Sequence, residues 1–501
     1  FFALEINRIE DAALEQRLED AALARFAPWL RDLRVFRPHQ LSDELEKLLH
    51  EKEVTGHSAW SRLFDETIAG IRVPLEGEEL TLSAALNLLS DPDRARREAA
   101  AKAIGQVLAR NVKLFSLIIN TIAKDKAVTD RWRNYPTPAS ARNRANMVED
   151  EVVAALVRAV TDSYPRLAHR YYQMKARWLG LGHLEHWDRN APLPGDDDRR
   201  IPWAEARGRV LDAYAAFSPE MAGIASRFFD RCWIDAAARP GKSGGAFSHG
   251  TVPSAHPYVL MNYHGKARDV MTLAHELGHG VHQVLAGGQG YLMAGTPLTL
   301  AETASVFGEM LVFRALLEAE ADPRRRRLML AQKVEDMLNT VVRQIAFYRF
   351  ELKLHEARAA RELAQEEIAA LWLEVQRESL GPVFDFADEY RMFWAYVPHF
   401  IHSPFYVYAY AFGDCLVNAL YAVYQDERAQ GRAEEFVARY LEMLRAGGTK
   451  RHRELLAPFG LDAADPQFWR RGLGIIEGFI DELSAGESSA GELTIGDHDG
   501  R

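Results

Sequence analysis

The stretch Asp269–Leu285, DVMTLAHELGHGVHQVL, is the most informative part of this 501-residue chain. Its apolar residues recur every three to four positions, which is the period of an amphipathic helix. It contains His275-Glu276-x-x-His279, so the two histidines lie on one face about one turn apart. Both imidazoles can bind one metal ion there, and Glu276 can reach a metal-bound water without being a ligand. The opposite, core-facing stripe consists of Leu273, Leu277, Val281 and Val284.

A third protein ligand is expected, because a catalytic zinc site has three and keeps one position open. The segment Leu298–Val312, LTLAETASVFGEMLV, predicts a second helix and carries Glu302. Glu302 lies among small and apolar residues, where a carboxylate needs a partner such as a metal. Glu309 follows two turns later on the same face. We therefore expect Glu309 to accept a hydrogen bond from one of the ligand histidines.

Each of these residues also has a non-catalytic interpretation. His275 and His279 would then be core histidines bound to backbone carbonyls. Glu302 would be a surface carboxylate, and Glu309 an ordinary charge on a helix face. His282 shares the first helix, but catalysis needs an open position on the metal. We interpret His282 as a neighbour of the site and not as a ligand.

Composition limits the function classes. The chain has 61 Lys and Arg against 71 Asp and Glu, a net charge of −10, which argues against a nucleic-acid-binding protein. Its two cysteines cannot form a disulfide framework, which fits a reducing compartment. No signal sequence is recognisable, and the apolar stretch Phe405–Tyr424 is interrupted by polar residues, which favours a buried helix over a membrane span. We expect a cytoplasmic protein without membrane or nucleic-acid partners.

Helical periodicity dominates the rest of the sequence. Asp91-Pro92 predicts the start of a helix that runs to about Asn111, and Gly180–Asp198 predicts a surface loop. Two stretches, Gly244–Phe247 and His256–His264, have the alternation of short strands. We therefore expect a mainly α fold with a small β-sheet beside the HExxH helix. Further helices are expected over residues 41–54, 149–178, 203–230, 301–320, 324–360, 363–380 and 432–446.

The two short strands suggest how a peptide would bind. A strand edge near a metallopeptidase site can pair with an extended peptide as an added strand. Gly245 and Ala246 are small enough for a close approach of the peptide backbone, and Asn262 and His264 end the next strand. We expect substrate contacts from Gly245, Ala246 and His264. The alternative for His264 is a surface histidine at the end of a strand.

Four motifs in order resemble a known family. They are HPYVLMNYHG, RDVMTLAHELGHGVHQ, AETASVFGEM and VPHFIHSPFYVYAYAFGD. Together with FALEINRIED and LSDPDRARREAA, they resemble the oligoendopeptidase F group of the thimet oligopeptidase family of zinc metallopeptidases. The resemblance extends over essentially the whole chain.

The resemblance implies a two-lobed helical zincin-like fold with a deep central channel and the active site at its floor. Substrates would be short unfolded peptides, because a folded protein cannot enter such a channel. The implied ligands of one zinc per chain are His275, His279 and Glu302, with Glu276 as the general base. Family members are usually longer at the N-terminus. We expect an N-terminal helical lobe at residues 1–115 that is truncated at its start, a catalytic region at 116–485 and a flexible polar tail at 486–501.

The segment Val397–Tyr410, VPHFIHSPFYVYAY, supplies a second group of polar side chains. Peptide hydrolysis passes through an oxyanion that tyrosine hydroxyls or an imidazole can stabilise. The resemblance implies that a histidine and downstream tyrosines do this. The candidates are His399, Tyr406 and Tyr408, with His402 as a substrate contact. Alternating tyrosines are also typical of an apolar core, so which of Tyr406, Tyr408 and Tyr410 faces the site stays open.

The sequence therefore predicts a zinc-dependent endopeptidase that hydrolyses internal bonds of short oligopeptides through a Glu-activated, zinc-bound water. A zinc carboxypeptidase of similar helical architecture is the second enzyme interpretation. A peptide with a blocked C-terminus distinguishes the two, because only an endopeptidase cleaves it. The interpretation outside the enzymes is a peptide-binding protein that keeps the metallopeptidase fold without turnover.

Overall fold

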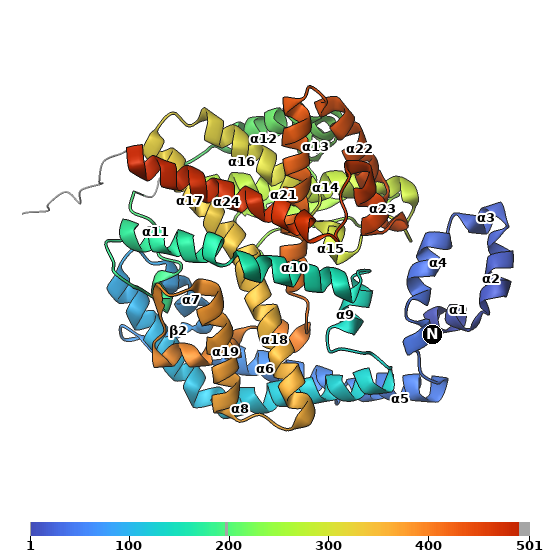
Figure 1. Ribbon diagram of the computed structural model, residues 1–501, viewed down its shortest axis with the longest axis horizontal. Helices are drawn as coiled ribbons and strands as arrows, with labels where there is room; N and C mark the ends of the chain where they lie inside the picture. Colours follow the sequence, from blue (N-terminus) through green and yellow to red (C-terminus); the bar gives the residue numbers. More distant parts are fainter. Residues whose placement is uncertain (1, 196–198, 490–501) are drawn as a thin grey trace, which may run out of the picture.

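The computed structural model describes residues 2–195 and 199–489, and most of them are helical (Figure 1). Upper and lower groups of helices are connected by α18 (Val342–Ala360), which contacts α8 and α19 below and α17 and α21 above. The lower group begins with α5 (Asp43–Glu53), α6 (His57–Gly70), β1 (Arg72–Leu75), β2 (Glu78–Thr81), α7 (Leu82–Asn87) and α8 (Arg94–Trp132).

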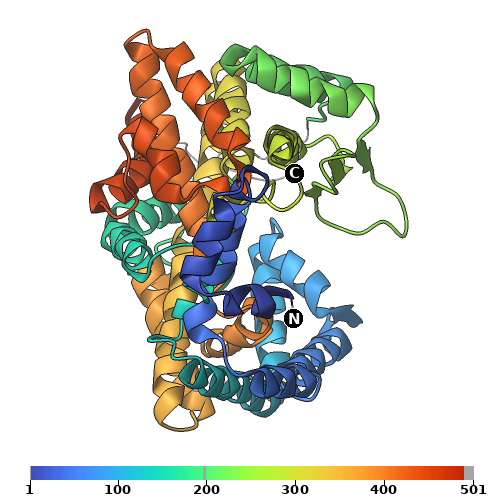
Figure 2. The same ribbon diagram turned by 90° about the vertical axis from the view of Figure 1, so that its right-hand side faces the viewer.

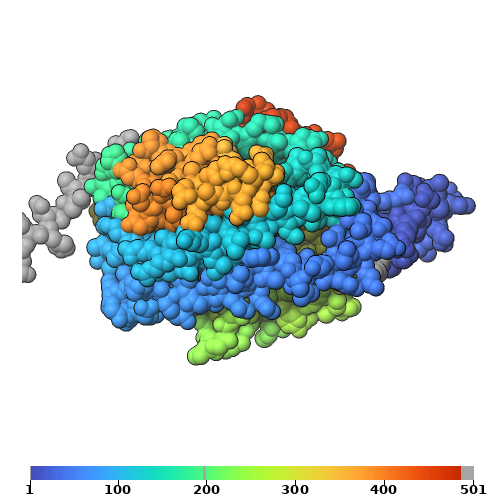
Figure 3. Space-filling view, turned by 90° about the horizontal axis from the view of Figure 1, so that it is seen from below, coloured from blue at the N-terminus to red at the C-terminus, as the bar shows by residue number. Residues whose placement is uncertain are grey.

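The upper group contains most of the remaining long helices. Its members are α12 (Trp203–Phe217), α13 (Pro219–Asp230), α14 (Ala267–Ala286), α15 (Leu298–Ala301), α16 (Ser305–Ala319), α17 (Pro323–Thr340), α21 (Tyr408–Ala429), α22 (Ala433–Arg445), α23 (His452–Leu456) and α24 (Pro466–Ser489). The connecting and lower helices are α9 (Ser140–Ala145), α10 (Asp150–Ser163), α11 (Arg170–Trp178), α19 (Gln365–Leu380) and α20 (His399–His402). The first four helices project from one end of the molecule (Figure 3): α1 (Phe2–Arg8), α2 (Asp11–Leu18), α3 (Ala21–Ala24) and α4 (Ala27–Arg34).

A small mixed sheet lies beside α14, as the sequence predicts (Figure 2). It consists of β4 (Ile234–Ala237), β5 (Phe247–His249) and β6 (Tyr258–Tyr263), in the order β4-β6-β5. The central strand, β6, is parallel to β4 and antiparallel to β5. Helix α14 contacts β5 and β6, which overlap the two stretches predicted to be strands from their alternating residues. The sequence analysis did not predict β4. The mainly α fold with this sheet beside the HExxH helix is therefore confirmed.

The longest helix, α8, extends well beyond the expected end at about Asn111. Its start is close to the predicted one, since the side chain of Asp93 accepts a hydrogen bond from the Ala95 amide at 2.9 Å. It continues to Trp132 because buried residues recur at the helical period, including Leu108, Val112, Phe115, Ile119 and Ile122. The expected division between lobes at residue 115 falls inside this continuous helix.

Two expected helices are each divided into a pair. The segment 203–230 forms α12 and α13, because Ser218 caps the second helix and Pro219 occupies its first position. The segment 324–360 forms α17 and α18, which meet at Val341. The expected polar tail at 486–501 is helical as far as Ser489, and residues 490–501 lie outside the described part of the chain. None of the helices in the described ranges is long and apolar enough to cross a membrane.

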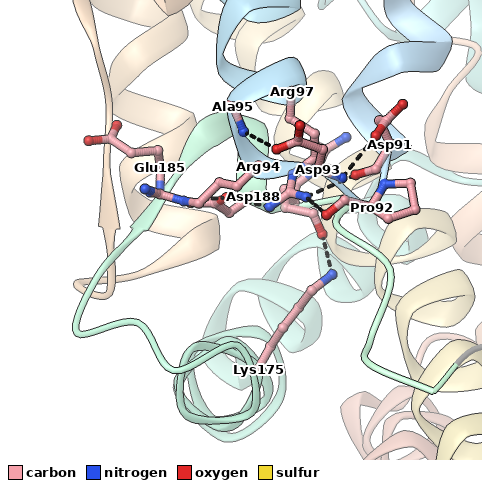
Figure 4. Close-up of polar contacts among 10 residues, drawn as sticks. Asp91, Pro92, Asp93, Arg94, Ala95, Arg97, Lys175, Glu185 and Asp188 are labelled. Carbon is pink, nitrogen blue, oxygen red and sulfur yellow. Dashed lines mark hydrogen bonds and ion pairs between the residues drawn. The ribbon is translucent and has the colours of Figure 1, made fainter. Parts of the chain in front are cut away.

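The expected surface loop at Gly180–Asp198 is wrong for its central part. Leu184 and Glu185 form β3, which pairs in parallel with β7 (Phe384–Asp385), and the next three residues form the 3-10 helix η4 (His186–Asp188). Asp188 is fully buried because Arg94 and Arg97 bind its carboxylate, at 2.8 and 2.9 Å (Figure 4). The acidic residues 196–198, which suggested a surface loop, lie outside the described residues.

A tight backbone contact in the upper group joins α14 to the start of α16 at Gly278. A Cβ atom at this position would lie 2.4 Å from the carbonyl oxygen of Ala304 and 2.6 Å from the Cα of Ser305. No residue with a side chain fits there without moving the backbone of α16. Gly278 therefore brings the start of α16, and the turn before it, directly against the HExxH helix.

We predict that Gly278→Ala lowers the free energy of unfolding by about 1–3 kcal/mol, because its methyl group meets backbone atoms that have no rotamer to change. Thermal denaturation followed by circular dichroism measures this loss. The matched control is Gly208→Ala on α12, where no atom lies within 4 Å of the added Cβ. Its higher helix propensity should stabilise the protein by about 0.5–1 kcal/mol. Equal stability of the two variants would contradict the close approach of α14 and α16.

Candidate active site

The HExxH helix, α14, presents two different faces. Leu273, Leu277 and Val281 are fully buried in the core, as their spacing predicts. His275 and His279 are partly exposed on the other face, with their ring centroids 4.9 Å apart and the ring planes at 83°. The one-turn spacing of the two histidines therefore turns both imidazoles toward the same space.

Glu302 completes a group of three donors. Its Oε2 atom lies 3.3 Å from Nε2 of His275 and 3.4 Å from Nε2 of His279. The hydroxyl of Ser305 donates a hydrogen bond to the same oxygen at 2.6 Å. One ligand atom from each of the three residues lies within 4.8 Å of the others, and no second such group occurs in residues 2–195 and 199–489. Two imidazoles and a carboxylate at this separation fit a tetrahedral divalent metal with one open position.

The backbone around Glu302 differs from the expected helix over Leu298–Val312. The segment forms α15 and α16 with a turn between them, and Glu302 lies in that turn with φ −81° and ψ 1°. Gly413 of α21 backs the side chain, since a Cβ there would lie 3.0 Å from Cβ of Glu302. The turn and the glycine together direct the carboxylate toward α14.

Glu309 makes the predicted contact with a ligand histidine. Its Oε2 atom lies 3.2 Å from Nδ1 of His275, on the side of the ring opposite to Glu302. Its other oxygen, Oε1, accepts a hydrogen bond from Nζ of Lys333 at 2.5 Å. Burial acts to raise the pKa of Glu309, but Lys333 and His275 outweigh it and lower the pKa to about 2. Glu309 is therefore an ionised acceptor that holds the His275 ring.

Glu276 lies beside the donor group and is not part of it. Only 6% of the residue is exposed, and its Oε2 atom has no hydrogen-bond partner. Burial raises the pKa of Glu276 to about 7, with Glu302 adding to the effect and His275 opposing it. A carboxyl group with this pKa can both accept and donate a proton near neutral pH. His282 is buried, its pKa is lowered to about 4 by burial, and it does not belong to the donor group.

Three aromatic side chains gather in the second segment. His399 Nε2 lies 3.4 Å from the hydroxyl of Tyr410, and the His399 ring centroid is 5.8 Å from that of Tyr406. The rings of Tyr406 and Tyr410 are 5.3 Å apart. Burial raises the pKa of Tyr410 to about 12, with smaller contributions from Tyr406 and from the charge of Glu302. The structure therefore brings His399, Tyr406 and Tyr410 together.

Tyr408 and His402 are not part of this cluster. The hydroxyl of Tyr408 accepts a hydrogen bond from Nδ2 of Asn146 at 2.8 Å, and the residue is completely buried. The physical reason is that the chain turns here instead of extending as a strand, since the Ala409 amide donates to the Tyr406 carbonyl at 3.1 Å and α21 starts at Tyr408. Strand alternation therefore does not hold from residue 406 to 410. His402 instead pairs with Asp65 of α6 at 2.8 Å. Tyr410, and not Tyr408 or His402, therefore lies with His399 and Tyr406.

The predicted substrate-binding strand begins two residues later than Gly245. Gly245 and Ala246 form the approach to β5, and Asn262 ties this approach to β6 by donating to the Gly245 carbonyl at 3.2 Å. No atom lies within 4 Å of a Cβ added at Gly245, so the backbone there is open. His264 is exposed after β6, and its own amide donates to Asp269 at 2.8 Å. A contact between these residues and a substrate stays a prediction.

Comparison with known proteins assigns the family. A sequence profile described as Peptidase family M3 matches residues 217–475, which is more than half of the chain and includes His275, His279 and Glu302. The chain belongs to peptidase family M3. A second profile, described as Oligopeptidase F, matches residues 5–72 of this M3 peptidase.

Relatives of this M3 peptidase have consistent names. Oligopeptidase PepF of Bacillus subtilis is 28% identical over 488 residues, which cover 96% of this chain and 72% of that protein. An oligoendopeptidase F homolog of Lactococcus lactis is 28% identical over 457 residues, or 89% and 74% of the two chains. The crystal structure of oligoendopeptidase-F from Enterococcus faecium has the same fold, with a TM-score of 0.76 and 24% sequence identity. The match covers 98% of this chain and 83% of that one. The M3 peptidase is thus a metalloendopeptidase similar to oligoendopeptidase F.

Lys333 and Asp414 are two buried residues of the M3 peptidase that the sequence analysis did not identify. Lys333 lies behind Glu309, and the charge of Asp414 on α21 acts on it from another helix. Burial raises the pKa of Asp414 to about 7, with Lys333 opposing the shift. A signal for Lys333 was available, because it occupies a core position next to Val334 and one turn after Leu330.

We predict that Lys333→Met weakens metal binding by about 10–100-fold, the usual effect of removing an outer partner of a ligand. The reason is that Glu309 would lose its buried cation and hold His275 less firmly. Competition with a chromogenic chelator measures the dissociation constant directly, without reference to activity. The control is Lys353→Met, which removes a surface pair with Glu374 and should leave metal affinity unchanged. Unchanged affinity in folded Lys333→Met would contradict this role.

Proposed function

We propose that this metalloendopeptidase is a zinc-dependent oligopeptidase that cleaves internal bonds of short, unfolded peptides. The observation that carries the proposal is the convergence of His275, His279 and Glu302 on one point, with the unpartnered carboxyl of Glu276 beside it. Two imidazoles, one carboxylate and a nearby general base are the residues that metal-assisted peptide hydrolysis requires. The names of the relatives support the same substrate class.

The proposed ligands are His275, His279 and Glu302, which would hold one zinc ion per chain. When bound, zinc supplies Lewis acidity that lowers the pKa of a coordinated water and polarises the substrate carbonyl. Glu276 then takes a proton from the attacking water and passes it to the leaving amine. Burial supports this role because it raises the pKa of Glu276 to about 7. Near neutral pH such a carboxyl group can take up a proton and release it again.

The oxyanion that forms at the carbonyl carbon needs hydrogen-bond donors besides the metal. We assign this role to the His399 and Tyr410 pair, with Tyr406 packed against both. Tyr410 is the better placed of the two tyrosines, since it contacts His399 directly and senses the charge of Glu302. These side chains are fixed by α20 and α21, so the donors are in position before a peptide binds.

We propose that the surfaces around the metal donors determine which peptides bind. An extended peptide would pair with the edge strand β5, near Gly245 and Ala246, with His264 at the end of the neighbouring strand. We carry over from the family resemblance the two lobes, the deep channel and the exclusion of folded proteins. The proposed division has a lobe at residues 1–115 and a catalytic region at 116–485, and its boundary falls inside the continuous helix α8. The profile matches at 5–72 and 217–475 lie on either side of this boundary and do not locate it.

Cleavage of internally quenched peptides tests the function. We expect cleavage of peptides with a blocked C-terminus, declining as the peptides are lengthened, abolished by chelation and restored by zinc. Glu276→Gln should retain zinc and lose about 10²–10⁴-fold in kcat, because proton transfer is removed. Cleavage confined to free C-termini would favour the carboxypeptidase. Zinc binding without hydrolysis of any peptide would favour a peptide-binding protein. Normal cleavage rates in Glu276→Gln would show that Glu276 is not the general base.

Tyr410→Phe and Tyr408→Phe form a matched pair that tests the second cluster. Each variant removes one hydroxyl from the same helix. We expect Tyr410→Phe to lower kcat by about 10²–10³-fold at nearly constant stability, the usual effect of losing an oxyanion donor. Tyr408→Phe should retain kcat and lose about 1–3 kcal/mol of stability, because the Asn146 amide is left unpaired. The reverse pattern would return the role to Tyr408.

A further inference from the structure

Two arginines outside the metal site lack an acidic partner. Arg343, the second residue of α18, stacks over the ring of Phe347 at 4.9 Å and lies 3.4 Å from the hydroxyl of Tyr396. Arg189 follows η4, and its Nε donates only to Oδ1 of Asn190, at 3.3 Å. Within the part of the chain that the structure describes, no carboxylate lies within 4.0 Å of either guanidinium. Both residues are only partly exposed, and a charged group largely withdrawn from water is normally paired with one of opposite sign.

The nearest acids are already occupied. Asp188, next to Arg189 in the chain, is held by Arg94 and Arg97, as the close-up shows (Figure 4). The other acid whose charge reaches Arg189 is Glu335. Its Oε1 atom accepts hydrogen bonds from Lys175 at 2.5 Å and from Tyr171 at 2.9 Å. Neither carboxylate is therefore free to neutralise the arginine pair.

The two arginines line one cavity of about 170 Å³. Its walls are mainly aromatic and include Trp372, Tyr390 and Tyr396. This is smaller than the ~300–1,000 Å³ of ordinary small-molecule sites, so it suits one charged group and not a whole peptide. The cavity matches a single carboxylate with a short apolar attachment.

Polar atoms in the walls of this cavity also lack partners. Both ring nitrogens of His186 and Nε1 of Trp187 are buried without a hydrogen bond, and so is Nε of Arg343. His186 is only 7% exposed and packs against Tyr390, with ring centroids 4.6 Å apart. Buried donors without acceptors are rare in folded proteins and commonly mark a missing ligand or water. Burial lowers the pKa of His186 to about 3, so its ring is neutral and only one of its two nitrogens can donate. That nitrogen, Nε1 of Trp187 and Nε of Arg343 are able to donate to an anion.

The like charges of the pair reinforce this conclusion. Burial lowers the pKa of Arg343, and the facing charge of Arg189 lowers it further. Each planar guanidinium offers paired N–H donors that match the two oxygens of a carboxylate. An anion between them would remove the repulsion and satisfy the unpaired donors together.

The cavity adjoins the proposed oxyanion donors. Tyr396, at the end of η6 (Asp388–Tyr396), precedes His399 by three positions. Arg343 is close enough for its charge, after burial, to act on His399. A group bound at the arginine pair would therefore lie within electrostatic reach of His399.

We propose that Arg189 and Arg343, with the aromatic cavity between them, form a binding site for a carboxylate. The assignment of a peptide C-terminus as the ligand rests on the proposed oligopeptidase function. The carboxylate is supplied either by the C-terminus of the peptide substrate or by a free small carboxylate. In the first case the site positions short peptides by their end, which links cleavage to peptide length.

The test compares the free-acid and amidated forms of the same quenched peptides in a ladder of lengths. In the wild type, amidation should raise KM by about 10–100-fold at the lengths whose end reaches the pair, the range for a charged hydrogen-bonded contact. Arg343→Gln should abolish this discrimination, and Arg343→Lys should restore part of it. The control Arg349→Gln removes a charge from the same helix outside the cavity, where it pairs with Glu378, and should discriminate normally.

A second arm identifies a free ligand and does not require hydrolysis. Sodium acetate is titrated at constant ionic strength, and the melting temperature of the zinc-loaded protein is followed. A rise in the wild type and in Arg349→Gln, absent in Arg343→Gln and Arg189→Gln, would support a free carboxylate as the ligand. If the wild type responds neither to amidation nor to acetate, the carboxylate site is overturned. Loss of all peptide cleavage with a retained acetate response would instead overturn the proposed function alone.

Discussion

The absence of a side chain at Gly278 is the constraint on which the active site depends. Because only hydrogen occupies that position, the backbone at Ala304 and Ser305 reaches van der Waals contact with α14. The turn that carries Glu302 is thereby held against the two histidines, which are already aligned by their one-turn spacing. Gly413 plays the complementary role on α21 by leaving room for the Glu302 side chain. Two glycines on different helices thus determine where a carboxylate of a third segment points.

Alternating charges impose a second constraint on the upper group of helices. His275 of α14 contacts Glu309 of α16, which contacts Lys333 of α17, and Asp414 of α21 acts on Lys333. Glu309 binds both His275 and Lys333, so its buried charge is compensated. Removing Lys333 would leave the Glu309 carboxylate without its buried cation. The same contacts that orient the His275 ring therefore also join α14, α16 and α17.

The site could be predicted from the sequence where its geometry is local. The positions of His275, Glu276 and His279 follow from helical spacing alone, and Glu309 follows from the same rule applied to the next helix. The sequence left open which of Tyr406, Tyr408 and Tyr410 faces the site because the three alternate like a strand. The structure instead has a turn that leads into α21 at Tyr408, and it packs Tyr406 against Tyr410. The segment around Asp188 was interpreted as surface loop because its acidic residues dominate the local composition. Only the distant Arg94 and Arg97 make burial of Asp188 favourable, and no local pattern contains that information.

The arginine pair is informative because the chain has no shortage of acids. Asp and Glu outnumber Lys and Arg by 71 to 61. Arg94 and Arg97 share one of these acids, Asp188, directly before Arg189 in the sequence. A partner for Arg189 or Arg343 would need only one substitution among the aromatic residues of the cavity. A built-in carboxylate there would occupy both guanidinium forks and exclude any other anion. An unneutralised pair whose charge reaches His399 is therefore the arrangement expected if the missing carboxylate arrives with a ligand.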